Sequence, residues 1–171
     1  MLTSQNLQQF INSNSVQAQI VHLAVPTLTV ADAAEALSVV PEQIIKSVLF
    51  LADGEPVLVI AGGTKRIGWK TLADYLGVSR RRLKTAKPEQ VLAIAGYVVG
   101  SVPPFGHQGK IRTIVETAVT QQSTIFGGGG DTNALLKLTV AELQRVVGEE
   151  TAVLAEQSKP ESGKNKDSNL M

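Results

Sequence analysis

Apolar and polar residues follow each other along the chain in short stretches, and their spacing predicts both helices and strands. Leu7, Phe10 and Ile11 recur at helical spacing and predict a helix over residues 4–14. Capping residues, an early proline or a closing glycine mark further predicted helices at residues 31–37, 69–76, 87–94 and 139–147, and a short one beginning at Pro41. These helices are short, and they are separated by stretches with a different pattern.

Strands are expected where β-branched and large apolar residues gather between turn residues. Residues 44–51 and 56–60 flank the turn Asp53-Gly54 and predict a hairpin. Further strands are predicted over residues 18–23, 97–99, 111–115, 123–126 and 134–138, with loops at 100–109 and 127–130. Because strands and helices are mixed without strict alternation, the pattern favours an α+β fold with a mixed or antiparallel sheet.

The length of 171 residues and the 43% hydrophobic content suit one domain with a packed core. Beyond about residue 155 the chain is polar and has no apolar period. We therefore expect an N-terminal helix or extension over residues 1–19, a folded domain over 20–155 and a disordered polar tail over 156–171.

Composition removes most of the standard catalytic groups. The chain has no cysteine, and its two histidines, His22 and His107, are far apart. These facts exclude a thiolate nucleophile and a Cys-ligated zinc and argue against a zinc site built on His pairs, so no metal or cofactor is expected. The N-terminus has no basic start, and no apolar run is long enough to cross a membrane, which predicts a cytoplasmic protein.

Charge is distributed unevenly, although the formal net charge is only +1. Residues 1–45 carry three acidic residues and no basic one, whereas residues 65–87 carry eight basic residues against Asp74 alone, a sum of +7. The second segment is a candidate surface for nucleic-acid phosphates, and an ordinary solvated surface is the alternative. The residues that we expect to contact a nucleic-acid backbone are Lys65, Arg66, Arg80, Arg81, Arg82 and Lys84.

Lys46 lies inside the predicted strand Ile-Ile-Lys-Ser-Val-Leu-Phe. Side chains alternate along a strand, so this lysine shares a face with Ile44, Val48 and Phe50. An ammonium group on an apolar face is partly desolvated and requires a polar or anionic partner. A ligand phosphate or carbonyl is one such partner; the alternative is an edge lysine that deters aggregation.

The segment Gly-Ser-Val-Pro-Pro-Phe-Gly-His at 100–107 is the second candidate. Its prolines restrict the backbone, and its glycines permit close approach of a ligand, so its amides could face an anion or a polarised carbonyl. A rigid turn is the alternative. A triad of Ser101, His107 and Asp131 is conceivable, but Val99 occupies the place where a nucleophile elbow requires glycine. The glycines at 62–63 and 127–130 predict either turns or the wall of a pocket.

Together, these segments resemble the YbaK/prolyl-tRNA-synthetase-associated editing domain family. The resemblance rests on PEQIIKSVLF at 41–50, GYVVGSVPPFGH at 96–107 and LLKLTVAEL at 135–143, with the helix 31–37 before them. It covers about residues 20–150. It implies an α+β fold with a central mixed, barrel-like sheet and flanking helices, and a hydrolase that cleaves the ester of mischarged aminoacyl-tRNA.

The resemblance also implies a site without metal or cofactor. Lys46 matches the functional lysine of the family and the 100–104 loop its carbonyl-binding loop, although Ser101 replaces a glycine found in many members. The catalytic residues expected on this basis are Lys46, Gly100, Ser101, Val102 and Pro104. The expected substrate-binding residues are Ser47, Gly62, Gly63, Pro103, Phe105, Gly106, His107, Gly128 and Gly129.

The expected partner is the 3′-terminal adenosine of an aminoacyl-tRNA that carries a small amino acid, on tRNA(Pro) or a related tRNA. An aminoacyl-tRNA synthetase is a further possible partner, and no membrane is involved. Two alternatives remain open at this point. One is a non-catalytic module of the same fold that binds tRNA or a synthetase, and the other is a small esterase that uses Ser101.

Overall fold

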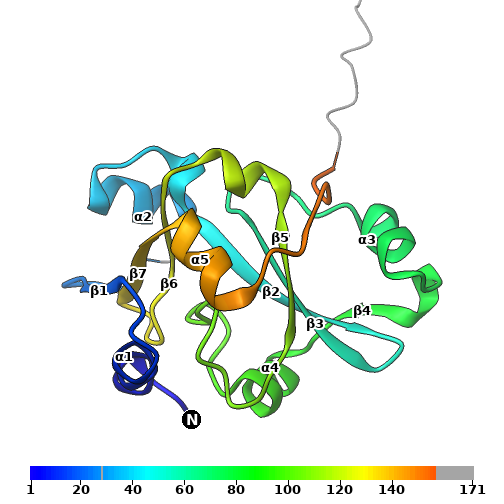
Figure 1. Cartoon of the computed structure of the whole chain (residues 1–171), viewed down its shortest axis with the longest axis horizontal. Helices are drawn as coiled ribbons and strands as arrows, with labels where there is room; N and C mark the ends of the chain where they lie inside the picture. The colour runs from blue at the N-terminus through cyan, green and yellow to red at the C-terminus, as the bar shows by residue number, and fades with distance from the viewer. Residues whose placement is uncertain (28, 157–171) are drawn as a thin grey trace, which may run out of the picture.

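The described part of the chain, residues 1–27 and 29–156 of the computed structural model, forms two β-sheets flanked by helices (Figure 1). The helices are α1 (Ser4–Ser13), α2 (Val30–Leu37), α3 (Trp69–Leu76), α4 (Pro88–Ala95) and α5 (Val140–Val147), with 3₁₀ turns η1 (Pro41–Gln43), η2 (Arg80–Arg82) and η3 (Thr117–Gln121). The strands are β1 (Ala18–His22), β2 (Ile45–Ala52), β3 (Glu55–Gly62), β4 (Leu83–Thr85), β5 (Arg112–Glu116), β6 (Thr124–Gly128), β7 (Ala134–Thr139) and β8 (Thr151–Ala152).

The larger sheet is mixed and has the strand order β4-β2-β3-β5-β8. In it β2 runs antiparallel to β3 and β4, whereas β5 runs parallel to β3 and β8. The smaller sheet, β1-β7-β6, is antiparallel, and a bridge between Ile44 and Phe126 joins the two. The predicted α+β class with a mixed sheet and flanking helices is therefore confirmed, although the strands form two sheets rather than a closed barrel.

The strand β2 is central because both of its faces are covered by core residues. Ile45 and Leu49 belong to the largest apolar cluster, which also contains residues of α1, α4 and α5. Val48 and Phe50 point to the other face and pack with Leu72 of α3. The near-continuous apolar sequence of this strand follows from its burial on two sides. Strand β2 therefore has a well-defined position, on which the neighbouring loops are built.

The strand predicted at residues 97–99 is wrong, because these residues form a turn after α4. Gly96 ends α4 in a left-handed conformation with φ +91°. The side chain of Tyr97 then turns into the core, where its hydroxyl donates to the Gly106 carbonyl oxygen over 3.0 Å. Because a buried tyrosine hydroxyl requires a hydrogen-bond partner, this bond holds residues 97–99 within the 96–107 loop. In the described chain, these residues pair with no strand.

Two short strands, β4 and β8, are not predicted from the sequence. Both are held by distant partners: β4 pairs with Phe50–Ala52 and β8 with Val115 and Glu116. The predicted loop at 127–130 is also partly wrong, since β6 continues through Gly128 and pairs with Leu135 there. The predicted tail at 156–171 lies outside the described residues except for Glu156. In the described residues, no helix has the length and apolar character needed to cross a membrane.

Candidate active site

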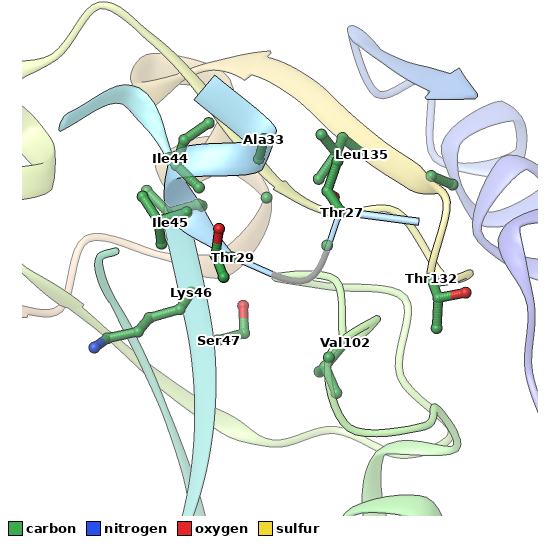
Figure 2. Close-up of a pocket in the computed structure, with 15 residues that line it drawn as sticks. Thr27, Thr29, Ala33, Ile44, Ile45, Lys46, Ser47, Val102, Thr132 and Leu135 are labelled. Atoms are coloured by element: carbon green, nitrogen blue, oxygen red, sulfur yellow. The ribbon is translucent and has the colours of Figure 1, made fainter. Parts of the chain in front are cut away.

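A cavity of about 280 Å³ lies beside β2, between α2, the end of β6 and the loop that starts at Gly100 (Figure 2). On the side of β2 away from β3, strand β4 covers only Phe50–Ala52. Within the described chain, Lys46–Val48 therefore have no strand neighbour on that side. We call this space, with the residues that line it, the main cavity.

The walls of the main cavity combine apolar side chains with hydroxyl groups and one charged residue. Apolar surface comes from helix α2, from the start of β7 and from the residues at the beginning of β2, namely Val30, Ala33, Ala134, Leu135, Ile44 and Ile45. Hydroxyl groups are contributed by Thr27, Thr29, Thr132 and Ser47. Lys46 is the only charged residue among the described lining residues, so the site suits a largely neutral group with an anionic or polar end.

The ammonium group of Lys46 points away from the loop at Gly100. Figure 2 shows the side chains of Lys46 and Ser47 leaving β2 on opposite sides. Nζ donates to the carbonyl oxygen of Lys65 over 2.7 Å. Partial burial, followed by repulsion from the Arg66 guanidinium, lowers the pKa of Lys46. The stem of the lysine thus lines the cavity while its charge lies beside a second cation, an arrangement that favours an incoming anion.

The hydroxyl group of Ser47 is buried and has no hydrogen-bond partner in the described chain. Its Oγ is inaccessible to solvent. A buried polar atom left without a partner costs about 1–3 kcal/mol. Ser47 is among the residues that line the main cavity, so a ligand there is the nearest partner that this covered oxygen could gain once its side chain turns.

The beginning of the 100–107 loop contributes two residues to the wall of the main cavity. Gly100 has φ +92° and, like Val102, lines the cavity. In the described chain, the N–H groups of these two residues donate to no acceptor. Ser101 between them is 2% exposed, and its Oγ donates to the carbonyl oxygen of Val98 over 2.7 Å. Ser101 therefore anchors the loop, whereas the amides of Gly100 and Val102 remain without a partner among the described residues.

Gly128 is the reason that the loop can lie against β6. A Cβ at this position would clash with the carbonyl oxygen of Val102 and would lie 2.7 Å from its carbonyl carbon. The Gly130 amide also donates to the Ser101 carbonyl oxygen over 2.9 Å. Glycines in the 127–130 segment thus allow two backbones to approach closely, and Gly127 and Gly128 form part of the cavity wall.

The later part of the loop faces another side of the molecule. The ring of Phe105 stacks on Phe10 of α1 with a centroid distance of 5.4 Å. The ring of His107 donates from Nε2 to the Pro103 carbonyl oxygen over 2.7 Å, and burial lowers its pKa. These contacts stabilise the loop from behind. The expected site residues that do not line the main cavity are Gly62, Gly63, Ser101, Pro103, Pro104, Phe105, Gly106, His107 and Gly129.

The conceivable triad of Ser101, His107 and Asp131 is not assembled. The serine hydroxyl and the histidine ring are bonded to separate backbone carbonyls. The Asp131 carboxylate accepts instead from the backbone N–H of Ser4 over 3.2 Å. The Ser101 esterase interpretation therefore has no base in position. Among the described residues, no group of three or more His, Cys, Asp and Glu gathers as a metal site.

Comparison with known proteins identifies the family. Residues 24–146 match the family model described as "Aminoacyl-tRNA editing domain". The chain belongs to the aminoacyl-tRNA editing domain family. The match includes Lys46, Ser47, Gly100, Val102 and Gly128, the expected site residues that the fold brings together around the main cavity.

Two relatives and one solved structure give this editing domain its context. The uncharacterized protein YwhH of Bacillus subtilis is 32% identical over 116 residues, 67% of this chain and 72% of that protein. The proline–tRNA ligase of Lactiplantibacillus plantarum is 30% identical over 103 residues, 60% of this chain but only 18% of the ligase. A solved structure described as a candidate trans-editing enzyme for prolyl tRNA synthetase has a TM-score of 0.84 and 26% identity. The alignment covers 90% of this chain and 97% of that one.

Sequence reasoning missed the cavity walls that come from other parts of the editing domain. Val30 and Ala33 of α2 and Ala134 and Leu135 of β7 are ordinary apolar residues in sequence, and nothing in their local pattern marks a cavity. The helix and the strand are both predicted, but which sides of them meet β2 depends on how the sheets pack.

The structure divides the basic residues of this editing domain into two groups. Lys65 and Arg66 follow β3 and lie near Lys46, which bonds the Lys65 carbonyl. The other group consists of basic residues that flank or lie in β4. This strand pairs with Phe50–Ala52, whose middle residue lies about 16 Å from Lys46 along β2 at ~3.3 Å per residue. In that group Arg82 is paired with Asp53 over 2.6 Å, whereas Arg80, Arg81 and Lys84 are exposed and form no ion pair in the described chain.

Proposed function

We propose that this editing domain hydrolyses the ester bond between a small mischarged amino acid and the terminal ribose of a tRNA, tRNA(Pro) or a related one. The observation that carries the proposal is the pair of unengaged amides of Gly100 and Val102, two residues that line the main cavity. Amides held in this way stabilise the negative charge that develops on a carbonyl oxygen during acyl transfer. Membership of the editing domain family supports the same chemistry.

The reaction requires no nucleophilic side chain, which fits a chain without cysteine. Water adds to the ester carbonyl, whose oxygen accepts from the amides of Gly100 and Val102. The bond between the acyl carbon and the ribose oxygen then breaks, and that oxygen takes up the proton released by the water. The neighbouring ribose hydroxyl can assist this transfer. Each amide donor in such a site typically contributes ~10²–10³-fold in rate.

The walls of the main cavity suit a small amino acid. The inner surface is formed by Ala33, Ile44 and Leu135, which are buried and close the space on that side. The Oγ of Ser47 is covered and has no partner in the described chain, and we expect its side chain to turn and bond a polar group of the bound substrate. We expect this pocket to select amino acids by size. One methylene more or less in an apolar pocket changes the free energy of binding by ~1–3 kcal/mol, so the selection between neighbouring sizes is modest.

Lys46 anchors the terminal nucleotide in this proposal, through its phosphate or ribose. The ammonium group now bonds the neutral carbonyl oxygen of Lys65, a partner that a phosphate can displace because it carries charge. Arg66 adds positive charge at the same place and lowers the pKa of Lys46 by repulsion. An anion between the two would remove this repulsion.

Replacing Lys46 with alanine is expected to slow deacylation of alanyl-tRNA(Pro) by about 10- to 150-fold, because hydrogen bonds to charged groups contribute ~1.5–3 kcal/mol. Release of the free amino acid is measured for alanyl-tRNA(Pro) and for tRNAs that carry other small aminoacyl groups. The matched control is Lys137→Ala, which removes an exposed lysine of β7 outside the main cavity. An unchanged rate in Lys46→Ala contradicts the anchoring role. A wild-type protein that binds tRNA but releases no amino acid would instead be a non-catalytic tRNA-binding module.

The double variant Arg80→Gln, Arg81→Gln is expected to weaken tRNA binding and to flatten its dependence on salt. Removing one phosphate contact reduces the slope of log affinity against log salt by ~0.7–0.9. These two arginines form no ion pair in the described chain, so their charge is available. Lys70→Gln is the control, because Lys70 is already paired with Asp74 over 2.6 Å. Equal slopes for wild type and the double variant would exclude a phosphate contact.

A further inference from the structure

A second, smaller cavity adjoins the main cavity on the other side of the loop. It has a volume of about 140 Å³, and we call it the side cavity. Ser47, Gly100 and Val102 line both spaces and form a wall between them. The side cavity is otherwise bounded by the middle of β2, the end of β4 with the residue after it, helix α4 and Val99. Nothing in the reaction described above uses this space.

We infer that the side cavity receives the base of the 3′-terminal nucleotide. The inference rests on the proposed function, which puts the ester carbonyl at Gly100 and Val102. The acyl group and the nucleoside leave an ester in different directions, so two spaces that meet at its carbonyl can hold one each. Buried apolar residues form the inner end of the main cavity, which suits the acyl group. Both spaces reach exposed residues, Thr29 and Thr132 in the main cavity and Val99 in the side cavity, so each can admit one part of the substrate from solvent.

The chemistry of the side cavity fits one face of a nucleobase. Its walls are mainly aliphatic and include Leu49, Val91 and Val99. A cavity of similar size, about 150 Å³ and lined by apolar side chains, accommodates benzene, so a flat ring can enter such a space. Thr85, an exposed residue of its lining, carries a hydroxyl that can bond the polar edge of the ring.

The charges around the side cavity also favour a nucleic acid strand. Lys84 and Lys87 flank Thr85 and Ala86 in sequence, are exposed and form no ion pair in the described chain. A strand that ends with its last base in the side cavity would therefore pass cations at the rim. An amino acid side chain in the same space would make no use of these two lysines.

The test compares binding of two short single-stranded RNAs that differ only at the 3′ end. One ends in adenosine and the other in an abasic ribose, and fluorescence anisotropy gives the affinity of each. The wild-type protein is expected to prefer the first by about tenfold, as burial of roughly 55 Å² of apolar surface predicts. Because the readout is binding, it remains informative even if no deacylation is observed, and the two proposals fail separately.

Two neighbouring valines provide a matched pair of variants. Val98 and Val99 are 41% and 50% exposed, but only Val99 lines the side cavity. Val99→Asp is expected to abolish the preference for terminal adenosine, whereas Val98→Asp adds the same charge and keeps it. The inference is overturned if the wild-type protein binds both RNAs equally, or if both variants lose the preference to the same extent. A Val99→Asp protein that keeps the preference but changes which aminoacyl group is removed would assign the side cavity to the amino acid instead.

Discussion

Alanine in place of Gly128 is expected to reduce the rate of deacylation by about 10²–10³-fold, the effect of losing one amide donor in such a site. The added Cβ would clash with the carbonyl oxygen of Val102 and would lie 3.0 Å from the carbonyl carbon of Ser101. Both atoms are backbone, so the strand and the loop must move apart. The amide of Val102 then leaves the position at which it would meet the carbonyl oxygen of the ester.

Gly109→Ala is the matched control for this change. Gly109 lies in the same loop region, but a Cβ there would meet no atom within 4 Å, and its φ is not positive. We expect the control to keep wild-type activity and the Gly128 variant to bind tRNA with near-normal affinity while its kcat falls. Thermal unfolding of both variants separates a shifted loop from a loss of fold. Wild-type turnover in a folded Gly128→Ala protein would contradict the role assigned to the loop amides.

The local pattern of the sequence is enough to predict the conformation of two central segments of the candidate site. The position of Lys46 on an apolar face follows from simple alternation, and the structure confirms that Val48 and Phe50 pack on that face. The two glycines and two prolines of the 100–107 segment likewise indicate a rigid loop with accessible amides, and Gly100 does adopt a positive φ. In both cases the information lies within a few residues.

The rest of the site depends on contacts that a local pattern does not contain. Ser101 and His107 are polar residues in a promising loop, yet each bonds a backbone carbonyl three or four residues away. Whether a polar side chain faces a cavity or the backbone is decided by packing around it, here by α1 behind the loop. The same holds for the cavity wall from Ala33 and Leu135, which comes together only when the two sheets meet.

We expect Glu116→Ala to lower the free energy of unfolding by about 3 kcal/mol. Among the charged residues, Glu116 should make the largest single contribution to stability. The side chain is 2% exposed. Its carboxylate accepts from the backbone N–H of Ala118 over 2.7 Å, and from those of Leu154 and Ala155 over 3.3 and 3.4 Å. Truncation leaves three donors without this acceptor, the amide of Leu154 buried and those of Ala118 and Ala155 partly buried, at ~1–3 kcal/mol for each that water cannot reach.

The same variant should also weaken the support of Lys46. The segment that Glu116 holds bonds the residues beside Lys65: the Gly68 amide donates to Leu154, and the Glu156 amide donates to Arg66, each over 2.7 Å. Because the Lys65 carbonyl is the acceptor for Lys46, loosening this segment is expected to raise KM for aminoacyl-tRNA more than it lowers kcat.

Urea denaturation measures the stability of Glu116→Ala, and Glu149→Ala provides the control. Glu149 is exposed and bonds no side chain in the described chain, so its removal should change stability by less than ~0.5 kcal/mol. Glu116→Gln is informative as well, because the amide keeps the shape and one acceptor oxygen but turns an NH₂ group toward backbone donors. It should therefore fall between wild type and Glu116→Ala. If Glu116→Ala unfolds at the urea concentration of the wild-type protein, the carboxylate does not hold the C-terminal segment, and the effect on KM should be absent too.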